Sequence, residues 1–300
     1  SEMCIRDSIC GNRNSFSKTD HDATFMHMKE DYMRNGQLKP GYNVNVATCS
    51  DFIIGSYISS DRNDVHTLIP FMEQLRKNYA GRNIGSVVVD SGYESEENYC
   101  WFEAHPETEL YVKPSNHEAV KHRKYRTDIS RRENMAYDAQ TDTYTCANGK
   151  LLQRTREKKT HTASGLEIAT SVYECNECDG CPLKEKCIRA CGSKKPMEER
   201  YKVIYVSKRF ARQRQAMEAK ISSPKGCLLR VNRSIQAEGN FAYVKQDLDF
   251  RRFLLRGNMK VAAEWLLFSL ALNILHLHHK IQNRRLESDL KIPSSFPAGL

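Results

Sequence analysis

The sequence has no long, uninterrupted run of apolar residues. The best candidate, Val261–Leu277, contains Glu264, Asn273 and His276, and such side chains are costly inside a bilayer. We therefore interpret this run as a buried helix and expect no membrane partner. The first residues, Ser1–Ser8, show neither periodicity nor a plausible translation start. We interpret them as an artefact of sequence assembly and expect the true chain to begin upstream.

The sequence also lacks the evenly spread, even-numbered cysteines of a secreted disulfide framework. It has 11 cysteines, five of which lie between Cys175 and Cys191. No signal peptide precedes them. This distribution favours a reducing compartment, and metal binding rather than disulfide bonds. We therefore expect a cytoplasmic protein.

The cysteine cluster has the spacing of a metal site. Four thiolates can close a tetrahedral Zn²⁺ site, and the expected ligands are Cys175, Cys178, Cys181 and Cys187, with Cys191 close behind. The spacing is tighter than that of paired Cys-x2-Cys motifs, so a four-cysteine iron–sulfur centre is an alternative. Cys146 is a substitute ligand, and a reduced loop facing solvent is the alternative without metal.

Positive charge exceeds negative charge. The 46 Lys and Arg residues outnumber the 37 Asp and Glu residues, for a net charge of +9. This balance suits a polyanionic partner, although a soluble protein can be basic without one. Basic groups lie at Lys121–Arg126, Arg131–Arg132, Arg154–Lys159, Lys208–Arg214 and Arg251–Arg256, and the aromatic residues Tyr125, Phe210, Phe250 and Phe253 are interleaved with them. Any one of these groups can also be ordinary solvated surface.

The first third of the chain alternates between strand and helix patterns. Ala23–Met33 predicts a short helix capped by Asp22, and residues 39–41 predict a break. The pattern then predicts an antiparallel pair, a helix, a strand buried on both faces, a helix and a strand. These are Tyr42–Thr48 with Phe52–Ile58, Asp64–Tyr79, Ser86–Val89, Ser95–Ala104 and Leu110–Lys113. Such alternation indicates a mixed α/β domain.

Composition divides the rest of the chain. Residues 117–221 are polar, basic and cysteine-rich, so we interpret them as an insertion into a core formed by residues 9–116 and 222–290. Within the insertion, Val203–Val206 predicts a strand. In the last part, Val261, Trp265 and Leu272 share one apolar face of a long helix with Phe268 and Leu275. Residues 291–300 are expected to form a loose tail.

Two acidic residues stand at positions typical of a functional site. Asp90 follows the strand Ser86–Val89, where a side chain faces the crevice at a sheet edge; it can equally be a turn residue before Gly92. Glu238 and Lys245 lie seven residues apart, which places them on one face of an α-helix. An acid there can hold a divalent metal ion and a lysine can bind phosphate, although a solvated helix face has the same pattern.

Several stretches together resemble bacterial insertion-sequence transposases with an Asp-Asp-Glu (DDE) domain. They are KPGYNVNVA, SSDRNDVHTLIPF, VVVDSGYESEENY, NRSIQAEGNFAYVKQDLDFRRFLLRG and KVAAEWLLFSLALNILHLHHKIQ. Glu238 and Lys245 match the family's Glu-x6-Lys element, and VVVDSGY matches the segment with its second Asp. The resemblance extends from about Ser15 to Asn283.

The resemblance implies a ribonuclease H-like mixed sheet that lacks its first strand and contains a cysteine-rich insertion. It implies two Mg²⁺ ions bound by carboxylates, here Asp90 and Glu238, with Lys245 beside them. The partner would be double-stranded DNA at transposon ends, bound by Arg233, Lys245, Arg251, Arg252 and Arg256. The active complex would be a homodimer, acting near the bacterial nucleoid.

Two features depart from the family. Its first Asp lies on a strand that would precede Ser8, and we interpret Asp20 and Asp22 as capping or turn residues. Ser234 occupies the Arg position of the family's Tyr-x2-Arg-x3-Glu pattern, and Arg233 is one residue early. Residues 9–300 are therefore expected to be inactive alone. A catalytically dead relic that still binds DNA, and a related metal-dependent nuclease, are the alternative functions.

Overall fold

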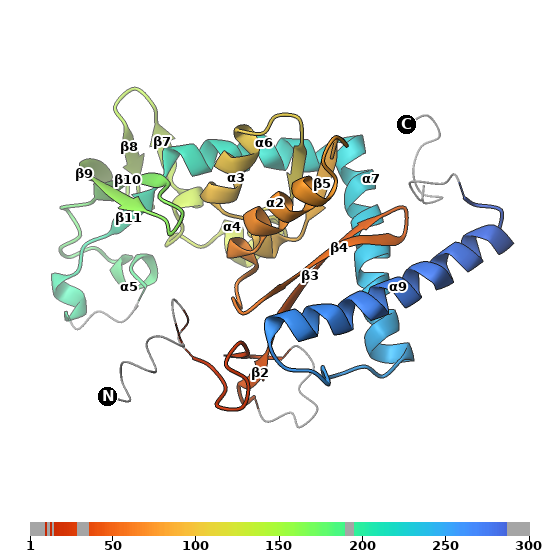
Figure 1. The fold of residues 1–300 in the computed structure, drawn as a ribbon. Helices are drawn as coiled ribbons and strands as arrows, with labels where there is room; N and C mark the ends of the chain where they lie inside the picture. The colour runs from red at the N-terminus through yellow and green to blue at the C-terminus, as the bar shows by residue number, and fades with distance from the viewer. Residues whose placement is uncertain (1–9, 11–12, 14, 29–35, 190–194, 287–300) are drawn as a thin grey trace. The chain divides into compact units, whose positions relative to one another are not determined.

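A computed structural model describes residues 10, 13, 15–28, 36–189 and 195–286. The chain forms two compact units (Figure 1). Unit 1 comprises residues 1–94, 101–112 and 220–300, and unit 2 comprises residues 95–100 and 113–219. Two helices, α3 (Glu96–Glu103) and α6 (Lys208–Ser222), have residues in both. The expected helix Ser95–Ala104 is confirmed by α3. Together the elements form a mixed α/β structure.

Unit 1 begins with a strand pair where a helix was expected. Thr24–Met26 forms β1, which pairs antiparallel with β2 (Lys39–Gly41). The predicted helix Ala23–Met33 is therefore wrong over these residues, and the predicted break at residues 39–41 is a strand. Pro40 is tolerated because each strand of a two-stranded sheet has an open edge. Residues 29–35 lie outside the described part.

The next two strands confirm the expected hairpin. β3 (Asn43–Cys49) pairs antiparallel with β4 (Phe52–Ser59). Ser50 and Asp51 connect them at φ values of 52° and 71°, the left-handed conformation of a two-residue type I′ turn. Aspartate visits this region more readily than most residues. The residues of the turn and the β-branched residues of the two strands therefore both favour a hairpin here.

The following elements also form as expected, with one difference in burial. A 3₁₀ turn, η1 (Asp64–His66), leads into α2 (Leu68–Asn78), and β5 (Ser86–Val89) pairs in parallel with β6 (Glu109–Val112). The valines of β5 are only half-buried, so the prediction of a strand buried on both faces is wrong. In the described residues β5 pairs with β6 alone.

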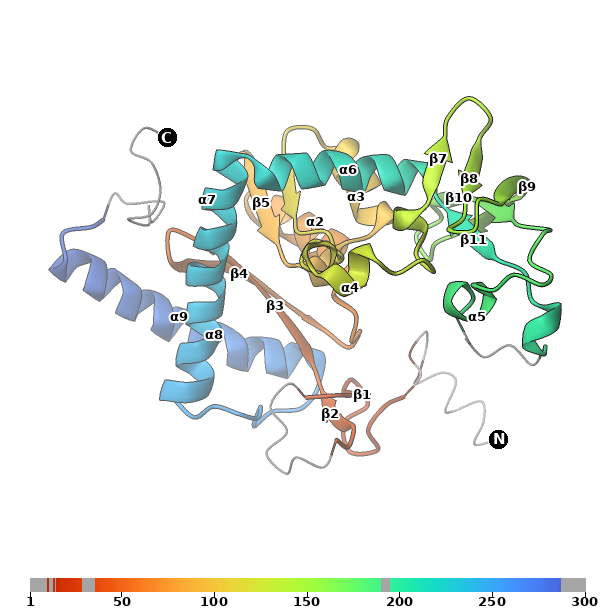
Figure 2. The same ribbon diagram turned by 180° about the vertical axis from the view of Figure 1, so that it is seen from behind.

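A continuous helical segment follows in the C-terminal part of unit 1. It consists of α7 (Pro224–Arg233), the π-helical η6 (Ser234–Glu238), α8 (Gly239–Ala242) and the π-helical η7 (Tyr243–Asp247) (Figure 2). Ser223 caps its start by accepting a hydrogen bond from the Gly226 N–H. The segment contacts both strand pairs, since α7 lies against β5 and η6 against β3.

The last helix, α9 (Asn258–Gln282), packs on the β3–β4 hairpin. Trp265 and Leu272 form a buried cluster with Ile53 and Val244, which confirms the expected apolar face. Asn273 fixes the position of the helix, because its amide pairs with both the N–H and the carbonyl of Ile53 at 2.8 Å.

Asp20 and Asp22 accept hydrogen bonds from the N-terminus of α9 and do not cap the helix that was predicted at Ala23–Met33. Asp22 accepts the Asn258 N–H at 2.8 Å, and Asp20 accepts the Gly257 N–H at 3.3 Å. Asp20 also accepts the Tyr42 hydroxyl at 2.6 Å. Negative charge at a helix N-terminus is favourable, so a capping role is present but belongs to a helix about 236 residues away in the chain.

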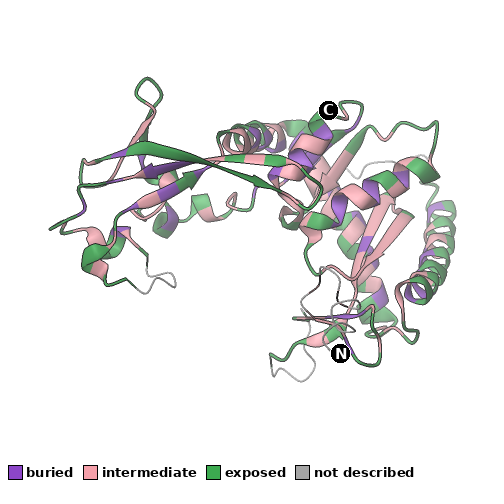
Figure 3. Cartoon of the chain, turned by 60° about the vertical axis from the view of Figure 1, so that its left-hand side comes forward, coloured by how far each residue is buried: buried purple, intermediate pink, exposed green. Residues whose placement is uncertain are grey.

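Unit 2 is built on one antiparallel sheet of five strands in the order β11-β10-β9-β8-β7. Their bounds are Ala136–Asp138, Thr143–Thr145, Leu151–His161, Glu167–Glu174 and Val203–Val206 for β7 to β11. The last confirms the expected strand Val203–Val206. β9 is exposed over most of its length (Figure 3). Unit 2 also contains the short helices α4 (Arg123–Arg126) and α5 (Lys184–Cys187).

The core of unit 2 lies at one end of this sheet. Leu152, Tyr173, Ile204 and Val206 pack there with Met135 and two cysteines, Cys175 and Cys178. The segments expected to be an artefact and a tail, residues 1–8 and 291–300, lie outside the described residues.

Candidate active site

Asp90 stands directly after β5, at the start of the 3₁₀ turn η2 (Ser91–Tyr93). Its carboxylate accepts the Ser91 N–H at 2.8 Å and is otherwise exposed. Asp90 is therefore a turn residue, as one interpretation expected, and its carboxylate also faces solvent, as a functional role requires.

A buried polar network holds the turn that carries Asp90. Asn45, on β3, is 2% exposed, and its side-chain oxygen accepts hydrogen bonds from the hydroxyls of Thr67 and Tyr93. Tyr93 belongs to η2, so Asn45 ties the end of β5 to β3. Burial raises the pKa of Tyr93, and the negative charges of Asp64 and Asp90 raise it further.

Asp64 is a second acid beside this turn. It accepts a hydrogen bond from the Asn43 amide at 2.7 Å. A Cβ on Gly92 would lie 3.0 Å from the Asp64 carboxylate, so glycine allows the acid to approach the backbone next to Asp90. Asp64, Asn45 and Tyr93 were not among the site residues predicted from sequence. Polar residues inside strand and helix patterns were the available signal, and Asn45 shares its face of the alternating strand with a second asparagine, Asn43.

Glu238 lies at the end of the π-helical turn η6, and both of its carboxylate oxygens are engaged. One accepts from Arg233 at 2.9 Å, the other from the Ser234 hydroxyl at 3.1 Å. A π-helical turn brings residues five apart together. The early position of Arg233 in the sequence pattern therefore still allows an ion pair with Glu238.

The same π-helical turns alter the helix geometry between Glu238 and Lys245. Their separation of seven residues matches two turns only in a regular α-helix, and here η6 and η7 interrupt that geometry. Lys245 lies 5.9 Å from the centre of the Phe241 ring and is exposed. Among the other basic residues, Arg251 pairs with Asp249 at 2.6 Å and Arg256 donates to the Thr19 carbonyl at 3.4 Å.

Asp90 and Glu238 lie on segments whose neighbouring residues interact. The helix before Glu238 contacts β5, and the positive charge of Arg233 acts on Tyr93, whose pKa it lowers. In the described part of the chain, however, no three His, Cys, Asp or Glu side chains are placed to hold a metal ion together. The two carboxylates suit Mg²⁺ by their chemistry, but they are too few to hold a metal pair alone.

The predicted cysteine ligands lie in unit 2. Cys175, Cys178, Cys181 and Cys187 line one small cavity, and Cys146 lines it as well. All five are free thiols in this structure. Burial raises the pKa of Cys175 to about 11 and also raises that of Cys187. Cys191 lies outside the described residues.

Comparison with known proteins gives one match. No curated protein and no solved structure is similar to the chain. One family model does match, over residues 145–278, which is somewhat less than half of the 300 residues. This segment includes Glu238, Lys245 and the cysteine cavity, but not Asp90. Residues 145–278 match the family model of the transposase DDE domain.

Proposed function

We propose that this protein is a DNA transposase of an insertion sequence, which cleaves and joins DNA at the ends of the element in the bacterial cytoplasm. The observation that carries the proposal is the transposase DDE domain match, which includes Glu238. The position of Asp90 supports it, because this exposed acid follows a parallel strand in the same unit as Glu238.

In this proposal Asp90 and Glu238 bind Mg²⁺. When bound, such ions activate water or a DNA 3′-hydroxyl for attack on a phosphodiester. The chain's own residues position the acids: Asn45 and Tyr93 hold the turn of Asp90, and Arg233 holds Glu238. Arg233 would have to yield one carboxylate oxygen to a metal ion, since it now donates to that oxygen.

We further propose that one more strand completes the sheet of unit 1. Within the described residues, β3 pairs only with β4, and β5 pairs only with β6. The Tyr93–Asn45 hydrogen bond brings the end of β5 near β3. A strand antiparallel to β3 and parallel to β5 would satisfy both open edges and cover the half-exposed valines of β5. The family resemblance puts the first catalytic Asp on such a strand, which gives a ribonuclease H-like sheet.

The proposed partner is double-stranded DNA. Arg251, Arg252 and Arg256 follow the segment that carries Glu238, and Arg251 and Arg252 are exposed. Together with Arg233 and Lys245 they would contact phosphates near the scissile bond, since backbone charge dominates such binding.

The exposed face of α9 suits a second copy of the chain. Leu267, Leu270, Ile274, Leu277 and Ile281 repeat at the heptad spacing of a coiled coil and are 44–69% exposed. With Met259 and Leu266 they supply an apolar centre for an interface of about 800 Å² per partner. By length and composition α9 could cross a membrane, but its opposite face packs on β4. Ile274→Lys should convert the dimer to a monomer in sedimentation; an unchanged dimer, or binding of wild-type protein to lipid vesicles, would contradict this assignment.

The second candidate is a DNA-binding protein without catalysis. The ion pair of Glu238 with Arg233 favours it, because a carboxylate with both oxygens engaged is not free for a metal. The two functions differ in whether Mg²⁺ changes the DNA.

The test uses the protein translated from the complete gene. Asp90→Asn and Glu238→Gln should each reduce Mg²⁺-dependent cleavage of element ends by more than about a hundredfold while leaving DNA binding intact. Asp247→Asn is the matched control, since Asp247 is an exposed acid close to Glu238 in sequence. Normal cleavage by either variant would overturn the assignment of that acid. Binding without cleavage by the wild-type protein would support the second candidate.

A further inference from the structure

The cysteine cavity of unit 2 draws its thiols from two distant segments. Cys175, Cys178, Cys181 and Cys187 come from the loop after β10, whereas Cys146 comes from the turn between β8 and β9. The cavity has a volume of about 20 Å³. A cavity needs roughly 10–15 Å³ to hold one water molecule, so this one has room for a single small ion.

Cys146 is held at the cavity by its own tight turn. Its N–H donates to the Lys150 carbonyl at 2.9 Å, and its carbonyl accepts the Gly149 N–H at 2.9 Å. The side chain is partly buried and packs on the core of unit 2. Cys146, Cys178, Cys181 and Cys187 line the same cavity. A thiol on a short turn facing three others is the arrangement from which zinc sites are built.

Cys175 has a different environment. It shares the apolar core with Cys178, but it is buried more deeply, at 1% exposed against 8% for Cys178 and Cys187, and it packs with Leu152 and Tyr173. Its N–H donates to the Lys202 carbonyl at 3.0 Å, which continues the pairing of β10 with the segment of β11. A side chain in such a core has little freedom to turn toward an ion without opening a gap.

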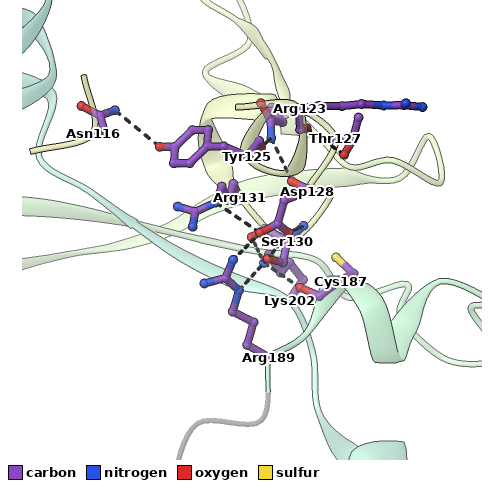
Figure 4. Close-up of polar contacts among 11 residues, drawn as sticks. Asn116, Arg123, Tyr125, Thr127, Asp128, Ser130, Arg131, Cys187, Arg189 and Lys202 are labelled. Atoms are coloured by element: carbon purple, nitrogen blue, oxygen red, sulfur yellow. Dashed lines mark hydrogen bonds and ion pairs between the residues drawn. The ribbon is translucent and has the colours of Figure 1, made fainter. Parts of the chain in front are cut away.

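A buried lysine beside the thiols requires negative charge. Lys202 is 8% exposed, and its ammonium group donates to the carbonyls of Ser130 at 2.6 Å and Cys187 at 2.9 Å (Figure 4). Within the described ranges no carboxylate forms an ion pair with it. A buried charge is costly unless it is paired. Lys150 and Lys184 also line the cavity, so three lysines lie around the thiols.

We propose that Cys146, Cys178, Cys181 and Cys187 bind one Zn²⁺ ion, and that Cys175 is a core residue rather than a ligand. This set replaces the one expected from sequence, which had Cys175 in place of Cys146. Four thiolates and one Zn²⁺ carry a net charge of 2−, which Lys202 would partly compensate. Binding releases the four thiol protons to solvent. No three of the described thiols are gathered at ligand distance, so the side chains rotate inward to form Zn–S bonds of about 2.3 Å.

The backbone geometry prepares one ligand in particular. The Lys202 N–H donates to the Cys178 sulfur at 3.4 Å. The ion would then tie the β8–β9 turn to the loop after β10, two segments that the sheet alone leaves separate at this end.

The test measures metal in the full chain, purified under reducing conditions, and does not depend on transposase activity. Wild-type protein should contain one zinc per chain. Cys146→Ser should weaken zinc binding by more than about a hundredfold, whereas Cys175→Ala should retain it. Cys227→Ser is the control, since Cys227 lies in unit 1. Loss of zinc in Cys175→Ala with retention in Cys146→Ser would restore the sequence-based set.

Two measurements on unmutated protein keep the proposal falsifiable if a variant fails to fold. Co²⁺ substitution should give the intense absorption of a tetrahedral four-thiolate site. Removal of the metal by a chelator should make Cys146 reactive toward an alkylating reagent, as read by mass spectrometry. Equal alkylation of Cys146 with and without metal would overturn its role. Bound iron with sulfide, or no bound metal, would overturn the zinc site.

Discussion

The two units contain equal numbers of basic residues but differ in their acids. Each has 23 of the 46 Lys and Arg residues, whereas the 37 Asp and Glu residues divide into 21 in unit 1 and 16 in unit 2. The net charges are therefore +2 and +7. Unit 1 is nearer neutrality because it has five more acids than unit 2, and Asp90 and Glu238 are among its acids.

The two units also differ in how their strands are paired. Unit 2 has five strands in one sheet around a compact core, and its functional groups are thiols and amines. Unit 1 has three separate strand pairs in its described residues, with open edges beside Asp90 and Asn45. Strand pairing therefore differs most beside the candidate active site, where unit 1 leaves strand edges open in its described residues.

A single methyl group at Gly226 should have the largest effect, and only in unit 1. A Cβ there would lie 2.3 Å from the Lys220 carbonyl oxygen and 2.7 Å from the Ile221 Cα. Gly226→Ala should therefore destabilise unit 1 by about 3 kcal/mol or more. Trp101 and Trp265 are the two tryptophans of the chain and both lie in unit 1, so tryptophan fluorescence during urea unfolding measures this effect.

Gly239→Ala is the matched control for that change. A methyl group on Gly239 would have no atom within 4 Å, and the residue is helical. The substitution should stabilise unit 1 by about 0.5–1 kcal/mol. Equal stability of the two variants would show that the close approach of α6 and α7 does not constrain unit 1.

Loss of the Asn45 side chain should have the next largest effect. Asn45→Ala removes the acceptor of the Thr67 and Tyr93 hydroxyls, and a buried group without a partner costs about 1–3 kcal/mol. The tryptophan transition should move to lower urea concentration. Asn78→Ala, at an exposed end of α2, should leave it unchanged. An unchanged transition in Asn45→Ala would mean that the hydroxyls find other partners.

Asp142 should make unit 2 sensitive to acid. Burial alone would raise the pKa of Asp142, but hydrogen bonds from Lys208, Tyr173 and Tyr137 outweigh it and lower the pKa to about 2. A carboxyl whose pKa is lowered in the folded state contributes stability above its unfolded pKa of about 3.9, and that contribution is lost as pH falls toward 2.

Asp142→Asn should therefore flatten the pH dependence of unit 2 between about pH 4 and pH 2, with a change of about 1 kcal/mol or less because the group is partly exposed. Asparagine tolerates the φ of 52° found at this position. Near-ultraviolet circular dichroism of the tyrosines reports the transition. Asp179→Asn, at an exposed acid, is the control; an identical acid response in both variants would contradict the role of Asp142.

The smallest expected effect concerns DNA binding. Arg252→Ala should reduce the slope of log affinity against log salt by about 1, since one phosphate contact is lost. Lys159→Ala should leave the slope unchanged, because Lys159 pairs with Glu167 at 3.0 Å across the β9–β10 ladder. Fluorescence anisotropy with labelled element-end DNA measures both. The reverse result would place the DNA-binding surface on unit 2.

Local patterns determined most elements and the residue types of the sites. The β3–β4 hairpin follows from β-branched alternation and a turn at Ser50 and Asp51, and α2 follows from its apolar spacing. The cysteine spacing alone indicated a metal site. These features depend on neighbours in the chain, where propensity and periodicity act.

The tertiary structure decided the features that depend on distant segments. Thr24–Met26 is a strand because Lys39–Gly41 supplies its ladder partner, and Asp22 caps α9 because the chain returns to it at Asn258. Cys146 reaches the cysteine cavity through the register of β8 and β9, and Arg233 pairs with Glu238 because a π-helical turn lies between them. Sequence spacing fixes which residues can meet within a few turns, whereas packing and strand pairing fix which of the distant ones do.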